Sequence, residues 1–566
     1  MTIGPSAPSP TENNADDPVS PGPSLTRRAM LGGLVAGAAT AGIPAAAALA
    51  QTRRNGRDQN DRARDNRDDG RGPDQQNRRA NDQPASLDLR GPDRFNRMFP
   101  GEPAFQEVTD ELLIQIAALG APGGLIDAKD DLSAGPVALI TDPELSLNNA
   151  NNLTQTAGTT FVGQFLDHDI TRDAGSPLGQ STSLGRSLNL RSAQFDLDTV
   201  YGGGPAQSPG LYETGDPSRF RVESGGQFED LPRTVDGTAI IADPRNDENL
   251  MIAGLHVAFL KFHNAVLERV RARQPDRGDE SAAFLETYRT VRLHWQWLIV
   301  HQFLPQFVGQ AMVNDVLRNG RQIFTTTQPQ IPVEFQTSAF RMGHSMIRPS
   351  YRANMAGDNG EPFFGMVFDP SQFASADPDD MSGGHRAPRR FIGWQTFFDF
   401  GDGEVKPNKR LDTHISTPLF QLPLGSIDTA RGEPIGPTSL ATRNLLRHIT
   451  WDIASGETVA ERMGASRLSP GDLADISDVA PLLANRTPLW LYILREADLM
   501  HDGNHLGAVG GRIVAEVFIA LLTLEADSLL NNPGWRPTLP SRSGAGDFAM
   551  VDLLTIAGVD PEARGQ

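Results

Sequence analysis

Gly163-Gln164-Phe165-Leu166-Asp167-His168-Asp169 is a short stretch that holds an amide, two carboxylates and an imidazole. If it is helical, Gln164 and His168 are four residues apart and share one face, with Asp167 at the edge of that face. Asp169 is rotated by about 100° from His168 and points elsewhere. One helical turn can therefore offer a base to one site and an anionic ligand to another. Taken alone, an Asp-His-Asp run is more often a solvated helix end.

The composition of the chain excludes several classes of function. The 566 residues are enough for a large core or several domains. The net charge is −19, with 70 acidic against 51 basic residues, which argues against a nucleic-acid binder. There is no cysteine, so disulfides, thiolate metal sites and cysteine nucleophiles are all excluded.

The first 86 residues are predicted to lie outside the folded domain. Residues 1–24 are rich in Pro, Ser, Asp and Asn and should be disordered. Arg27-Arg28, the Ala/Gly-rich stretch 31–49 and the end Ala48-Leu49-Ala50 resemble a twin-arginine export signal cleaved after Ala50. A permanent membrane anchor is the alternative, although the stretch is poor in Leu, Ile and Phe. Residues 51–86 are almost free of apolar side chains and predict a disordered mixed-charge linker.

Residues 87–566 predict a mainly α-helical fold. Apolar residues recur at steps of three and four in several segments, and almost no segment alternates with a period of two. Long loops over 121–158, 171–245 and 349–440 separate these segments. We therefore expect a single large helical domain with long loops and little β structure. The predicted helices cover 107–119, 248–273, 283–304, 443–455, 477–485, 489–499 and 511–530.

Two further stretches carry side chains that suit a site, and each also has a structural explanation. In Asp243-Pro244-Arg245-Asn246-Asp247-Glu248, Asp243 or Asn246 could cap the long helix that follows. Arg245 and Glu248 would face the same way. In Phe340-Arg341-Met342-Gly343-His344-Ser345-Met346-Ile347, a neutral His344 could bind a metal or be a hydrogen-bonded core histidine.

Two more stretches complete the candidate chemistry. In Arg443-Asn444-Leu445-Leu446-Arg447-His448, Asn444 and Arg447 share a helical face, and an amide carbonyl could accept the second N–H of a ligating histidine. In the stretch from Ser192 to Tyr201, alternate oxygen-bearing residues suit a hard cation such as calcium, or form an ordinary acidic loop.

Together, and in this order, these five stretches resemble the animal-type haem peroxidases, over about residues 88–540. The chain looks like a bacterial member of that family. The resemblance implies that His168 is the distal histidine, Arg245 the distal arginine and Gln164 the glutamine that binds distal water and a halide. It implies that His344 is the proximal iron ligand and that Asn444 orients it. Arg341 and Arg447 match arginines near the haem propionates.

The resemblance also implies a calcium site and covalent haem. The calcium ligands would be Asp169, Ser192, Gln194 through its backbone, Asp196 and Asp198. Asp167 and Glu248 match carboxylates that form ester links to haem methyl groups in mammalian members. Asn249 stands where myeloperoxidase has the methionine of its sulfonium link, so that third link should be missing.

The function implied is that of an exported peroxidase with haem b and Ca²⁺ as cofactors. It would reduce hydrogen peroxide, pass through a ferryl intermediate and oxidise a halide, thiocyanate or a phenol. His168 would move the peroxide proton, and Arg245 would stabilise the charge on the leaving oxygen. The partners implied are peroxide, a small anionic or phenolic reductant and the twin-arginine export machinery. The protein would then lie in the periplasm, the cell envelope or the medium.

Three alternatives stay open at this point. A fatty-acid dioxygenase of the same superfamily would carry a tyrosine a few residues before His344, but residues 338–343 contain none. An exported calcium-binding structural protein would have lost its haem site. A non-haem metalloenzyme could use His501 and His505, four residues apart, although Gly503 between them indicates a loop.

Overall fold

A computed structural model describes most of the chain from residue 85 onward. The described residues are 85, 87, 93–102, 107–173, 175–273, 280–357, 359–384, 388–427 and 436–566. The export signal expected over 1–50 and almost all of the linker expected over 51–86 lie outside these residues.

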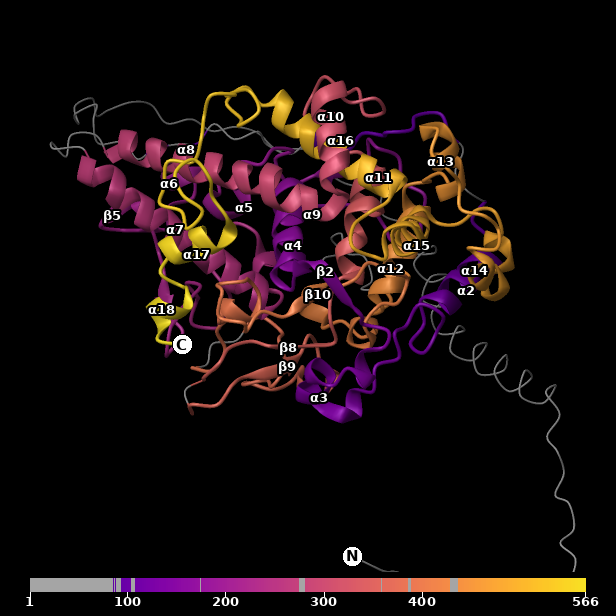
Figure 1. Cartoon of the computed structure of the whole chain (residues 1–566), viewed down its shortest axis with the longest axis horizontal. Helices are drawn as coiled ribbons and strands as arrows, with labels where there is room; N and C mark the ends of the chain where they lie inside the picture. The colour runs from indigo at the N-terminus through magenta and orange to yellow at the C-terminus, as the bar shows by residue number, and fades with distance from the viewer. Residues whose placement is uncertain are drawn as a thin grey trace, which may run out of the picture.

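Helices dominate the described part of the chain, and every sheet in it is a single antiparallel pair of strands (Figure 1). The mainly α-helical expectation is therefore confirmed. The helices are α2 Asp110–Leu119, α3 Gly135–Thr141, α4 Gly158–Ile170, α5 Asp198–Tyr201, α6 Gly204–Gln207, α7 Leu250–Arg273, α8 Glu280–Leu298, α9 Leu304–Val308, α10 Gln310–Asn319, α11 Val333–Thr337, α12 Leu440–Thr450, α13 Gly456–Met463, α14 Ala474–Val479, α15 Leu489–His501, α16 Ala508–Leu524, α17 Met550–Ile556 and α18 Pro561–Arg564.

Most of the strand pairs lie in the segments that were expected to be long loops. They join β1 Asp93–Arg94 to β3 Leu188–Asn189, β2 Asn151–Thr156 to β10 Pro407–Lys409, β4 Tyr212–Glu213 to β5 Asp216–Phe220, β6 Glu223–Ser224 to β7 Glu229–Asp230, and β8 Ser350–Arg352 to β9 Phe364–Met366. Apart from β2 and β5, each strand has only two or three residues, too short to show a periodic pattern in the sequence.

The long helix α7 forms the core of one half of the domain. Its apolar residues step by three and four, and it packs against α8 and α4. By length and composition α7 could cross a membrane, but 83% of its most apolar window is buried inside the fold, as in a core helix. A π-helical turn, Ile299–Phe303, separates α8 from α9, so the predicted helix over 283–304 is not one regular helix.

Other predicted helices also have different bounds, and the helix expected over 443–455 is α12, which runs from Leu440 to Thr450. Residues 477–485 do not form one helix, because α14 ends at Val479 and Pro481 starts a short 3₁₀ turn. Proline lacks the N–H that a continuing helix needs. The helix expected over 511–530 is α16, which begins at Ala508 and ends at Leu524.

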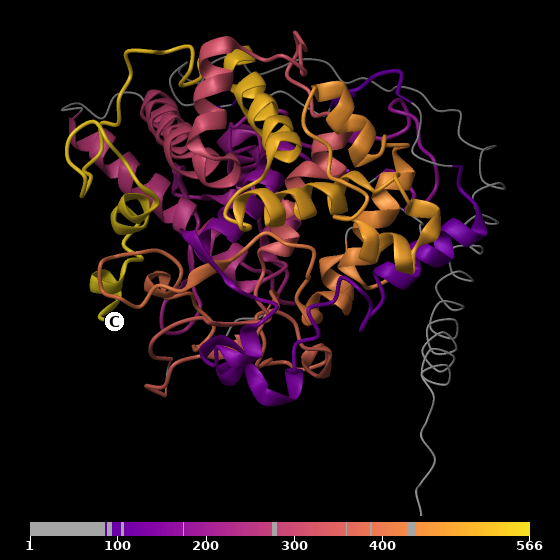
Figure 2. The ribbon, with the colours of Figure 1, turned by 45° about the vertical axis from the view of Figure 1, so that its right-hand side comes forward.

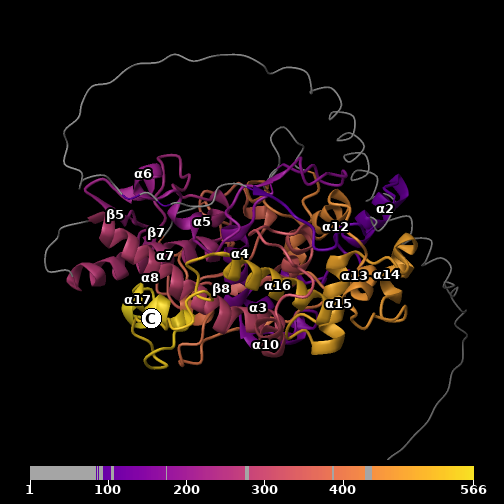
Figure 3. The same ribbon diagram turned by 90° about the horizontal axis from the view of Figure 1, so that it is seen from above.

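The helix α4, which carries the stretch 163–169, lies in the middle of the domain. In Figures 1 and 3 it lies between the pair α7 and α8 on one side and the group α12 to α15 on the other. Figure 2 brings that orange group forward. Gly158, the first residue of α4, lies against the ring of Phe398, and a Cβ there would lie 2.3 Å from Cζ of that ring. The close approach of this ring therefore requires glycine where α4 begins.

Candidate functional site

One cavity collects most of the predicted site residues from elements far apart in the sequence. Its walls come from α4, the 3₁₀ turn η4 (Pro244–Asp247), the 3₁₀ turn η6 (Ala339–Ser345) and α12. It holds about 1450 Å³ of space, its open mouth included. The residues predicted for catalysis or haem binding that line it are Gln164, Asp167, His168, Arg245, Glu248, Arg341, His344 and Arg447.

The imidazole of His168 is held by a side chain outside the cavity lining. Its Nδ1 lies 2.8 Å from Oδ1 of Asn246, whose Nδ2 lies 2.9 Å from Thr199 Oγ1 and 2.9 Å from Nδ1 of His256. Burial lowers the pKa of His256 to about 3, so its Nδ1 is a neutral acceptor for that amide N–H. The Asn246 oxygen is thereby aimed at His168. The Nδ1 of His168 then carries a proton, and Nε2 is the ring atom that can exchange a proton with the cavity.

The cavity-facing atoms of α4 meet a carboxylate from the far end of η4. Gln164 Nε2 donates to Glu248 Oε1 over 2.7 Å, and the same oxygen lies 3.2 Å from His168 Nε2. If either His168 Nε2 or Glu248 Oε1 carries a proton, that atom can donate a hydrogen bond to the other. Asn249 donates to Gln164 Oε1 over 3.1 Å. The sequence predicts that Arg245 and Glu248 face the same way, and both side chains line the cavity.

The guanidinium of Arg245 is fixed by a fully buried carboxylate. Asp243 caps η4 through Arg245 N and accepts from Arg245 Nη2 over 2.7 Å. These contacts hold the pKa of Asp243 well below its usual range and raise that of Arg245, despite the opposing effect of burial on both groups. Arg245 also donates to the His168 carbonyl over 3.2 Å and lies 3.7 Å from Asp167 Oδ2. Burial raises the pKa of Asp167, and Arg245 opposes that effect.

His344 lines the cavity from η6 as a neutral imidazole. Burial, with Arg341 nearby, lowers the pKa of His344 to about 3. Its Nδ1 lies 2.8 Å from Nδ2 of Asn444, while Arg341 Nη1 donates to Asn444 Oδ1 over 3.3 Å. Asn444 therefore pairs with His344, but its nitrogen rather than the expected carbonyl oxygen faces the ring. A 180° turn of the amide would place the oxygen there.

The two arginines expected near propionates differ in their partners. Arg447 donates to Asp173 Oδ2 over 3.1 Å and to Ser176, so its charge is already paired. Arg341 donates to the Gln336 carbonyl over 3.0 Å and to Asn444. Within the described part of the chain, it forms no ion pair with a carboxylate. Burial, with the charge of Arg447 nearby, lowers the pKa of Arg341 to about 10.

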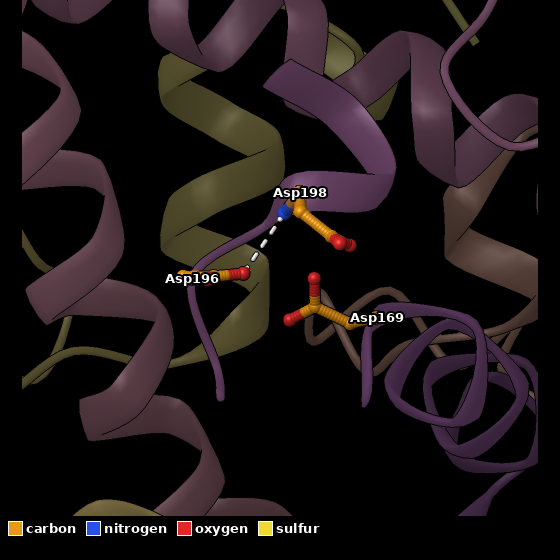
Figure 4. Close-up of side chains that lie close together, drawn as sticks. All are labelled: Asp169, Asp196 and Asp198. Carbon is orange, nitrogen blue, oxygen red and sulfur yellow. Dashed lines mark hydrogen bonds between the residues drawn. The ribbon is translucent and has the colours of Figure 1, made fainter. Parts of the chain in front are cut away.

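A second site lies on the other side of α4, where Asp169 approaches the loop before α5 (Figure 4). One carboxylate oxygen from each of Asp169, Asp196 and Asp198 lies within 4.8 Å of the others. Both oxygens of Asp169 are buried and, among the described residues, accept no hydrogen bond of ordinary distance and angle. Ser192 Oγ donates to Asp196 over 2.7 Å, Ser192 N donates to Asp198 over 3.0 Å, and Gln194 lies in the same loop.

The negative charges of these three carboxylates repel one another. Burial, followed by the neighbouring carboxylates, raises the pKa of Asp169 and Asp196 well above the usual value. Burial also raises the pKa of Asp198 to about 6, although Arg191 opposes that rise. A divalent cation would offset most of the negative charge of this cluster, and carboxylate oxygens are the ligands that calcium prefers.

Sequence reasoning missed three supporting residues. The sequence indicates Asn246 and Asp243 only as helix caps, and Asn249 only as the replacement for a methionine. The spacing of Asp243 and Arg245 permits their ion pair. Nothing local indicates that Asn246 would contact His168, 78 residues away.

Comparisons with known proteins show similarity to peroxidases. Residues 176–384 match the family model described as animal haem peroxidase. A 190-residue segment is 25% identical to a peroxidasin homologue of Caenorhabditis elegans and covers 30% of this chain and 14% of that protein. A 110-residue segment is 33% identical to a dual oxidase of Drosophila melanogaster and covers 19% and 7% of the two proteins. The chain thus spans a small part of the length of these relatives.

Among solved structures, peroxidase A from Dictyostelium discoideum shares the fold. The alignment has a TM-score of 0.51 at 14% identity and covers 82% of this chain and 92% of that chain.

Proposed function

We propose that this chain is an animal-type haem peroxidase, which binds haem in the cavity and reduces hydrogen peroxide. The observation that carries the proposal is the convergence of His168, Arg245 and a neutral His344 on one cavity. These are a base, a fixed cation and an iron ligand.

The residues present fit a haem. A neutral imidazole is the form that binds iron, and His344 is held in that form by burial. Arg341 is a cation on the cavity wall without a carboxylate partner within the described residues, and buried charges are normally paired. A haem propionate would supply that missing anion.

The chain's own groups would then move the protons of peroxide. His168 Nε2 accepts a proton from one peroxide oxygen and returns it to the other, which leaves as water. Asn246 stabilises the protonated ring by keeping its oxygen on Nδ1–H. Arg245, held by Asp243, stabilises negative charge on the departing oxygen. Haem, when bound, supplies the iron and the redox equivalents.

The proposal also covers the electron donor and the way in which haem is attached. A donor N–H of Gln164 at the cavity favours a small anion such as a halide or thiocyanate, and phenols are the second donor class. Asp167 and Glu248 both line the cavity and are available for ester links to haem methyl groups.

The acidic cluster supports a calcium ion as the second cofactor. Asp169, Asp196 and Asp198 would bind it, with Ser192 and the Gln194 backbone as further ligands. The unsatisfied oxygens of Asp169 are the supporting observation. The sequence pattern over 27–50 supports export by the twin-arginine route.

An absorption spectrum of the protein purified with haem tests the proposal. We expect a Soret band and peroxide-dependent oxidation of bromide, iodide, thiocyanate or a phenol. His344→Ala should abolish the native spectrum, whereas His414→Ala, with an imidazole 43% exposed, should leave it intact. A wild-type protein that binds no haem, or that oxygenates fatty acids without oxidising these donors, would overturn the proposal.

A further inference from the structure

We propose that Asn249 is a positioning residue that fixes the polarity of the Gln164 amide, and so makes the distal side of the cavity select anionic electron donors. The inference rests on the proposed haem function and deepens it. Asn249 lines the cavity and is 4% exposed.

The orientation of both amides follows from one backbone N–H group, which can only donate a hydrogen bond. The backbone N–H of Ile252, in the first turn of α7, can only donate, and it donates to Asn249 Oδ1 over 2.9 Å. Asn249 therefore caps α7 with its oxygen. Its nitrogen faces the other way and donates to Gln164 Oε1 over 3.1 Å.

This hydrogen bond also fixes the orientation of the Gln164 amide. Because its oxygen is taken by Asn249, its Nε2 must face the cavity, where it donates to Glu248 Oε1 over 2.7 Å. An amide nitrogen carries two N–H groups, so one remains for a ligand. Glu248 Oε1 can only accept and so favours the same orientation, while Asn249 holds the opposite end of the amide.

The orientation in which Asn249 caps α7 thus determines whether the distal site favours an anion. An N–H facing the cavity stabilises a halide or thiocyanate, and a carbonyl oxygen in the same place repels it. Hydrogen bonds to charged groups are stronger than those to neutral groups. A polarity reversal should therefore change anion affinity more than it changes haem binding.

The test is a bromide titration of the ferric haem protein, followed by the Soret spectrum. Asn249→Asp keeps an oxygen for Ile252 N but cannot donate to Gln164, and its carboxylate competes with Glu248 for the Gln164 N–H groups, which turns the amide away from its wild-type orientation. We expect the bromide dissociation constant to rise by about tenfold or more. Asn249→Ser also caps a helix well but cannot hold Gln164, and should raise the constant by a smaller factor.

A double-mutant cycle separates the polarity of the Gln164 amide from the negative charge that Asn249→Asp adds. In a Gln164→Ala background, Asn249→Asp should change bromide affinity by less than about twofold, because its effect passes through the amide. An equal loss on both backgrounds would mean simple charge repulsion and would overturn the inference. So would unchanged bromide affinity in Asn249→Asp.

Two further readouts keep the result clear. Melting temperatures of both variants should stay close to that of the wild type, because both variants keep the cap of α7. If Asn249→Asp does not fold, the test uses Asn249→Ser, and an unchanged bromide affinity in that variant overturns the inference. A wild-type protein without a Soret band overturns the proposed function itself. A normal Soret band with either contrary bromide result overturns only the role of Asn249.

Discussion

The substitution Asn246→Ala tests how the distal base is prepared. Asn246 is fully buried and contacts His168, Thr199 and His256 at once. Its removal leaves the Nδ1–H of His168 without an acceptor and frees the ring to turn or to carry its only proton on Nε2. With that proton on Nε2, the imidazole cannot accept one from peroxide.

The structure sets the expected magnitudes. Each buried group left without a hydrogen bond costs about 1–3 kcal/mol, so loss of the three contacts should destabilise the fold by at least about 3 kcal/mol. A positioned proton-transfer group contributes about 10²–10⁴ in rate. We expect Asn246→Ala to slow the reaction with peroxide by at least about 100-fold.

The assay is stopped-flow mixing of the haem-loaded protein with peroxide, followed by the change in the Soret band. Asn246→Asp is the matched control, because a carboxylate still accepts the His168 Nδ1–H although it cannot donate to Thr199 or His256. It should retain a rate within about tenfold of wild type. A haem-loaded Asn246→Ala protein that reacts at about the wild-type rate would refute the reasoning, as would an equally slow Asn246→Asp.

Three further predictions concern other parts of the chain. Calcium chelation or Asp169→Asn should disturb the Soret spectrum, since Asp169 precedes the end of α4 and adjoins the distal base; spectra that resist both changes would contradict the calcium site. After acid–acetone extraction, haem should stay with the wild-type protein and be released from the double variant Asp167→Asn, Glu248→Gln; complete release from wild type would exclude ester links. Glu496 accepts from Val509 N and Gly510 N at the start of α16, and burial raises its pKa to about 7. Its contribution to stability is therefore fully present below about pH 4.5 and is lost as pH rises through 7, so wild type should lose about 2–3 kcal/mol between about pH 5 and 8 relative to Glu496→Gln. Denaturant unfolding at both pH values measures this, and a pH-independent difference would contradict it.

The local geometry of the site could be predicted from sequence because helix periodicity fixes it. Four-residue spacing places Gln164 and His168 on one wall of the cavity, and a one-residue step sends Asp169 to the acidic cluster. The helix α7 could be predicted for the same reason.

Contacts between distant segments could not be predicted in this way. Asn444 and His344 are 100 residues apart, and the approach of one to the other is decided by how α12 packs near η6. The sequence also contained no pattern for the short strand pairs. The break at Pro481, in contrast, was visible in the sequence and should have ended the predicted helix over 477–485.

The placement of His168 and Asp169 on successive positions of α4 has a thermodynamic consequence. A cation that orders the end of this helix would also order the imidazole beside it, and a porphyrin that orders the imidazole would order the carboxylate. Linkage requires that each ligand change the affinity of the other by the same factor. Metal content during maturation would then determine how completely the protein retains its pigment, without any contact between the two ligands.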